Sequence, residues 1–80
     1  MKPFTYSYKN ETVNASYESY MEDGYNRYRI FLDGLSFVIA PMGIRSPNGA
    51  IIWVQSVKPG ETVLEHDFVQ AVGEGMSLTI

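Results

Sequence analysis

Apolar and polar residues alternate along most of the first 40 positions of the chain. This period of two is the pattern of strands that bury one face and expose the other. Alternating stretches cover about residues 3–9, 12–20, 25–32 and 35–41, and a run of β-branched and aromatic residues, AIIWVQSV, follows at 50–57. We therefore predict five strands, most of them joined by short turns.

Two Asp-Gly pairs, at positions 23–24 and 33–34, mark the second and third turns between these strands. Gly supplies the positive φ angles that a tight hairpin turn needs, so strand pairing can be counted outward from each pair. The count places Ile30 opposite Tyr17 on the preceding strand and opposite Phe37 on the following strand. The second, third and fourth strands are therefore predicted to pair antiparallel with a defined register.

The first hairpin needs a turn between the strands at 3–9 and 12–20. We place a two-residue turn at Asn10 and Glu11, which sets Tyr8 opposite Val13. Asn-Glu is not a favoured turn pair, so a loop one residue longer is the alternative. With this assignment the apolar residues of all three hairpins fall on one side of the sheet, which we call the inner face. Its members are Phe4, Tyr6, Tyr8, Val13, Ala15, Tyr17, Tyr28, Ile30, Leu32, Leu35, Phe37 and Ile39.

The second half of the chain predicts a loop and a helix around the fifth strand. Pro and Gly dominate residues 41–49, PMGIRSPNG, which we predict to be a loop. Residues 62–75 follow a helical period, with acidic residues at the start and Gly73 and Gly75 at the end, as is typical of helix termini. Its apolar stripe consists of Leu64, Phe68, Ala71, Val72 and Met76.

The predicted fold class is α+β. An antiparallel β-meander of about five strands has an apolar inner face that needs a cover, and the C-terminal amphipathic helix is the element available to pack on it. Packing on one side leaves the other side of the sheet open. We call this second side the outer face.

The outer face combines apolar residues with arginines. Pairing sets Glu18 opposite Arg29, which favours a contact across the strands. The fifth strand leaves two alternatives, because its odd and even positions are both apolar: Trp53 joins the outer face in one, and Ile52 and Val54 join it in the other. The candidate binding residues are Tyr20, Arg27, Arg29, Phe31, Val38 and Trp53.

Composition narrows the class of protein. Eighty residues predict one domain, and contents of 45% apolar and 14% aromatic residues argue against disorder. The absence of Cys excludes disulfides and thiolate metal sites and favours a cytoplasmic protein. We find neither the apolar core of a signal peptide nor the roughly 20 apolar residues of a membrane-spanning helix, so no membrane association is expected.

Candidate catalytic chemistry is sparse. His66 is the single histidine and lies between Glu65 and Asp67. Neighbouring side chains on a helix point about 100° apart, so these carboxylates do not converge on the imidazole. We therefore assign no catalytic residue, no metal ligand and no cofactor, and we expect that the chain is not an enzyme.

Two hypotheses for function follow from the outer face. The first is a small protein-interaction module that self-associates or binds another protein, because exposed apolar surface with Arg and aromatic residues is typical of interfaces. The alternative is binding of single-stranded nucleic acid, with bases stacked on aromatic rings beside arginines. The net charge of −3 and the scatter of six Lys and Arg residues along the chain disfavour the alternative.

Overall fold

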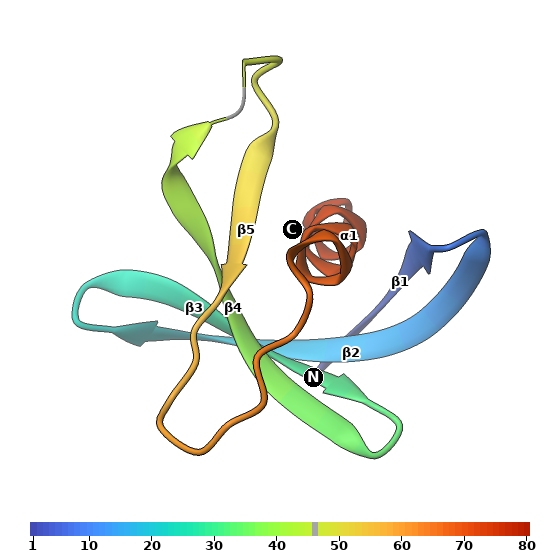
Figure 1. The fold of residues 1–80 in the computed structure, drawn as a ribbon, viewed down its shortest axis with the longest axis horizontal. Helices are drawn as coiled ribbons and strands as arrows, with labels where there is room; N and C mark the ends of the chain where they lie inside the picture. The colour runs from blue at the N-terminus through green and yellow to red at the C-terminus, as the bar shows by residue number, and fades with distance from the viewer. Residues whose placement is uncertain (46) are drawn as a thin grey trace.

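The computed structural model describes residues 1–45 and 47–80, and residues 44 and 45 by their backbone alone. Five strands form one antiparallel sheet in the order β1-β2-β3-β4-β5, and a single helix, α1, packs against it (Figure 1). The sheet is curled, and the α+β fold class predicted from the sequence is confirmed. The elements are β1 (Lys2–Tyr8), β2 (Glu11–Glu22), β3 (Tyr25–Leu32), β4 (Leu35–Arg45), β5 (Ile51–Gln55) and α1 (His66–Ser77).

The registers of the second and third hairpins are confirmed. Ile30 lies opposite Tyr17 on β2 and opposite Phe37 on β4. The turns between these strands contain Gly24 at a φ of 82° and Gly34 at a φ of 74°, values that favour glycine. The outer-face pair predicted from the turn also forms, with Glu18 opposite Arg29, and Tyr20 lies opposite Arg27.

The predicted register of the first hairpin was wrong by two residues. Tyr8 lies opposite Glu11, not Val13, and Tyr6 takes the position opposite Val13. The turn is formed by Lys9 and Asn10, which both have positive φ, at 50° and 64°. A two-residue hairpin turn of this kind matches the twist of the flanking strands. Because side chains alternate with a period of two, the shift by two leaves every residue on its predicted face.

Strand β4 continues into the segment predicted to be a loop. It runs to Arg45, and its pairing with β5 is irregular between Pro41 and Arg45, where β4 has extra residues. A β-bulge accommodates residues such as Pro41 that do not fit regular strand pairing, so β4 continues beyond it. Within the predicted 41–49 loop, residue 46 lies outside the described residues.

Helix α1 begins later than predicted because the residues before it are held extended. The side-chain amide of Gln55 donates to the Thr62 carbonyl at 3.0 Å and accepts from the Leu64 amide at 2.8 Å. Glu65, the N-cap, has an extended ψ of 140°. Leu64 therefore packs against the core from the linker, and the first helical residue is His66.

The core lies between the inner face of the sheet and α1. The predicted inner-face residues of β1 to β4 are buried or pack against the core, except Leu35, which is exposed, and α1 contributes residues at helical spacing. Phe68 of the predicted stripe is half-buried and contacts three aromatic rings, whereas Val69, which was not in that stripe, is fully buried. The buried core consists of Phe4, Tyr6, Tyr17, Ile30, Phe37, Ile39, Trp53, Val69, Val72 and Met76, none more than 5% exposed.

Helix α1 packs between the two edges of the curled sheet. Figure 1 shows it nearly end-on, with β5 on one side and β1 on the other, and its contacts are mainly with these two strands. A Cβ atom on Gly73 would lie within 3.0 Å of the Trp53 indole of β5. A Cβ atom on Gly75 would lie within 3.0 Å of the Tyr6 Cα atom and the Thr5 carbonyl of β1.

The two glycines therefore serve a different purpose from the one predicted. Both lie inside the helix, which runs to Ser77, and they do not terminate it. Residues two apart on a helix point about 200° from each other, so Gly73 and Gly75 face opposite strands. At each of the two positions the neighbouring strand lies too close to the helix for a Cβ atom, and glycine has none.

The edge of β5 is also bonded to the helix. The Gln70 side chain accepts from the Trp53 amide at 2.9 Å and donates to the Ile51 carbonyl at 2.8 Å. These are the groups that an added strand would use, and an uncovered edge strand is a template for aggregation. The amide of Gln70 thus takes the place of a neighbouring strand over these residues.

We predict that Gly73→Ala destabilises the protein. Ala is the better helix former by up to about 1 kcal/mol at an exposed position. At this position the new methyl group forces the Trp53 ring to move, and we expect a net loss of about 1–3 kcal/mol in the free energy of unfolding. Urea denaturation measures the change.

The matched control is Glu74→Ala, one residue further along the same helix at an exposed position. We expect a change of no more than about 0.5 kcal/mol, as for most surface substitutions. A Gly73→Ala protein that is more stable than the parent would show that α1 does not pack closely on β5.

Candidate functional site

The outer face carries a continuous set of apolar side chains on β3, β4 and β5. Register places Val38 opposite Arg29, and Ala40 opposite Val54. Phe31 lies one row away, opposite Ser36. We call this set, with the flanking arginines, the outer patch: Tyr20, Arg27, Arg29, Phe31, Val38, Ala40, Ile52 and Val54.

Part of the outer patch is already buried in the single chain. Val38 and Ala40 are only 8% and 7% exposed, yet neither belongs to the core between the sheet and α1. Within the described residues no helix or strand packs on the outer face, because α1 contacts β1, β4 and β5 from the inner side. Around them on the same face, Phe31, Ile52 and Val54 are half-buried.

Each arginine of the patch lies over a tyrosine ring. The guanidinium carbon of Arg29 is 5.8 Å from the ring centre of Tyr20, and that of Arg27 is 5.8 Å from the ring centre of Tyr25. Both distances fall in the range of cation–π contacts. Although Glu18 and Arg29 are opposite each other, no ion pair joins them in the part of the chain that the structure describes.

Arg27 also has an unsatisfied donor. Its Nη1 atom donates to the Asn26 carbonyl at 3.3 Å, but its Nε–H is buried without an acceptor. A buried polar group without a partner destabilises a protein by about 1–3 kcal/mol. The Nε–H of Arg27 is therefore a donor that an acceptor on a partner could satisfy.

Trp53 does not belong to the patch. It is 2% exposed, its ring lies 5.6 Å from that of Tyr28, and it faces Gly73 of α1. The alternative with Trp53 on the outer face was therefore wrong, and Ile52 and Val54 point outward instead. Alternation along β5 could not decide between the two faces. Gly73, which we predicted to mark the end of the helix, was the signal that a bulky ring lies against this position.

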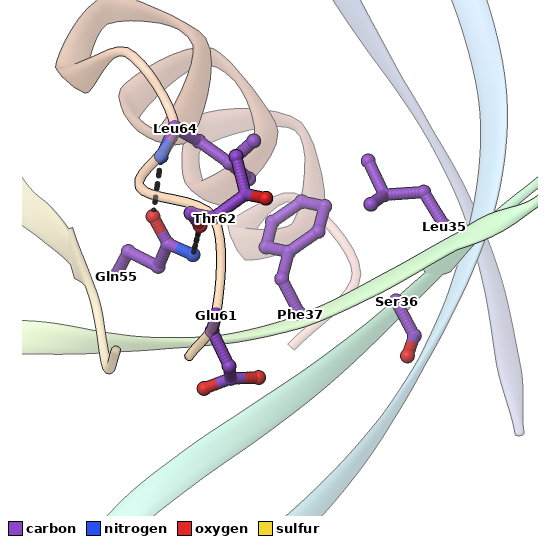
Figure 2. Close-up of a pocket in the computed structure, with 7 residues that line it drawn as sticks. All are labelled: Leu35, Ser36, Phe37, Gln55, Glu61, Thr62 and Leu64. Carbon is purple, nitrogen blue, oxygen red and sulfur yellow. Dashed lines mark hydrogen bonds between the residues drawn. The ribbon is translucent and has the colours of Figure 1, made fainter. Parts of the chain in front are cut away.

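A second surface feature lies where the start of β4 meets the linker before α1. Two adjoining hollows of about 300 Å³ and 320 Å³ share Leu35 and Leu64, and we call them together the end groove. Figure 2 shows the first hollow, in which Leu35 and Phe37 lie on the helix side of β4 and Gln55 holds the linker. Its other lining residues are Ser36, Glu61 and Thr62, and those of the second hollow are Tyr8, Lys9, Glu65 and Phe68.

Acidic groups dominate the charge around the end groove. Glu61 and Glu65 line it, and the Tyr8 hydroxyl lies 3.4 Å from the Glu65 carboxylate, to which it donates. Desolvation first, and then the negative charges of Asp67 and Glu65, raise the pKa of Tyr8 above its usual 10.0. The ammonium of Lys9, 5.3 Å from the Tyr8 ring centre, acts in the opposite direction on that pKa.

The remaining sequence features do not assemble into a site. His66 is exposed at the first position of α1. No group of three His, Cys, Asp or Glu side chains suited to a metal ion occurs among the described residues. Nor does any helix of the described chain have the length and apolar character that crossing a membrane requires.

Comparison with known proteins returned no relative: no family model, no curated protein and no solved structure matches this chain.

We predict that the pKa of Tyr8 responds to the charges of the end groove with a defined sign. Asp67→Asn removes a negative charge that opposes ionisation of the phenol, so the pKa of Tyr8 should fall toward 10.0. Lys9→Gln removes the neighbouring positive charge and should raise it further. Titration of the Tyr8 ring signals by NMR measures both shifts. A parent pKa below 10.0, or no response to Asp67→Asn, would contradict an acidic groove.

Proposed function

We propose that this chain is a protein-interaction module that binds through its outer patch and associates with a second copy of itself. The role is one of binding, without catalysis. The observation that carries the proposal is an apolar face that no described helix or strand covers, next to two arginines that form no ion pair among the described residues. A contiguous apolar patch of this type on a single chain often marks a binding surface.

The chemistry of the outer patch supports an interface between proteins. Phe31, Ile52 and Val54 keep part of their surface in water, and a partner that covers them removes apolar area from solvent. Arg and aromatic residues are enriched at interface centres, where they combine apolar contact with hydrogen bonding. Because Val38 and Ala40 are already buried, the patch is formed before a partner arrives.

The arginine geometry adds to this support. Stacking on Tyr20 and Tyr25 limits the conformations of the two guanidinium groups, so less side-chain entropy is lost when a partner binds them. A partner carboxylate that draws Arg27 outward also frees its buried Nε–H to find an acceptor.

Binding of single-stranded nucleic acid has less support. Base stacking needs free aromatic faces, and Arg29 already lies over the ring of Tyr20. Phosphate binding needs a track of positive charge, whereas the chain has nine acidic against six basic residues. Salt-dependent binding of a labelled oligonucleotide at micromolar protein would favour this alternative over a protein partner.

The experiment that tests the proposal is a mass measurement by sedimentation across a protein concentration series. We expect the average mass to rise above that of one chain as the concentration increases. Phe31→Glu should weaken association at least ten-fold, because it introduces a charge into the centre of the outer patch while the inner core is unchanged.

Asn14→Glu is the matched control. Asn14 is exposed on the same side of the sheet, opposite Thr5 of β1 and away from the outer patch, and the charge change is the same. We expect its association to equal that of the parent. A parent that has the mass of one chain at every concentration would contradict self-association, and equal association of the Phe31→Glu variant would exclude the outer patch.

A further inference from the structure

The outer patch and the end groove have complementary chemistry. The patch presents Phe31 in the row next to Arg29, with Arg27 one row further along β3. The groove presents apolar walls, including Leu35 and Leu64, beside the carboxylates of Glu61 and Glu65. Opposite charges of this kind steer two surfaces together and fix how they align.

The end groove is also open and large enough to take an aromatic side chain. Its two hollows of about 300 Å³ and 320 Å³ meet at Leu35, which is 41% exposed and lies outside the core. Leu64 and Phe68 form further apolar surface and are half-buried. An exposed leucine at the junction of two apolar hollows is surface that a partner would bury favourably.

The charge around the groove selects the kind of partner. Glu65 lines the groove, and the negative charge of Asp67 reaches the same Tyr8 hydroxyl. Lys9 is the one basic residue among those lining either hollow, and its ammonium lies by the Tyr8 ring. The groove is therefore suited to an apolar side chain flanked by arginine or lysine.

The outer patch of the chain itself carries an apolar side chain of this kind, Phe31, with Arg29 two residues before it. We propose that the outer patch of one copy docks onto the end groove of the next, with Phe31 in the hollow beside Leu35 and Arg29 facing Glu65. This inference rests on the proposed function and names its partner surface. Because the two surfaces are different, the contact is head-to-tail, and repeating it gives a ring or a chain of copies.

Two double variants separate the two halves of the contact. The patch variant is Arg29→Glu with Phe31→Glu. The groove variant is Leu35→Lys with Glu65→Lys, at two exposed positions outside the core. Glu74→Lys is the control for the Glu65→Lys half, since it makes the same charge change on the exposed side of α1 away from the groove. Circular dichroism on each variant establishes that it is folded, and Arg29→Glu alone replaces the patch variant if that variant is not.

Sedimentation of the variants, alone and mixed, is the test. We expect each double variant alone to associate at least ten-fold more weakly than the parent, and Glu74→Lys to behave as the parent. An equimolar mixture should form a heterodimer that does not grow further, because the groove of the patch variant and the patch of the groove variant are both intact.

Other outcomes overturn the inference in distinguishable ways. If the groove variant associates like the parent while the patch variant stays a single chain, the outer patch pairs with itself, and the proposed function stands without the head-to-tail contact. If both variants are weakened but their mixture forms no heterodimer, the head-to-tail contact is excluded, and the proposed function stands because the outer patch is still required. If the parent itself stays a single chain throughout, self-association and this inference fail together.

Discussion

The close packing of α1 between the two edge strands is the contact on which the rest of the structure depends. It is possible because Gly73 and Gly75 remove side chains on opposite sides of one helix, against Trp53 of β5 and Tyr6 of β1. With the helix in this place the curled sheet has an apolar interior, and β5 gains hydrogen bonds from Gln70 where it would otherwise meet solvent. An 80-residue chain, which buries only about 60% of its surface on folding, thereby obtains a core without disulfides.

The position of the helix also decides which surfaces are left for partners. It occupies the inner face and covers part of the β5 edge, so strand addition is opposed there, and the apolar residues of the outer patch stay without cover from a described element. The extended linker that leads into α1, held by Gln55, forms a wall of the end groove. Both proposed binding surfaces thus follow from the position of this helix. The outer patch carries basic groups, and the end groove carries mainly acidic ones.

The sequence predicted which face of the sheet each residue of β1 to β4 occupies, but not the register of the first hairpin or the orientation of β5. The period of two in β1 to β4 determines which side each residue faces, and it survived a two-residue error in the first hairpin because Lys9 and Asn10, not Asn10 and Glu11, form the turn. The orientation of β5 could not be predicted, because both of its sides are apolar and the choice is made by contact with Gly73. Long-range contacts of single side chains, such as Gln55 with the linker, leave no periodic pattern in a sequence.

The exchange rate of the Trp53 amide hydrogen tests the placement of α1 most directly. This N–H donates to the Gln70 side chain, not to a strand, so its protection depends on the helix remaining on the β5 edge. Native-state hydrogen exchange followed by NMR gives the free energy of the opening that exposes it. We predict protection close to that of Ile30 in the central strand, because exposure requires the helix to leave the sheet. Exchange near the rate of an unprotected amide would show that β5 is an open edge and would contradict this account.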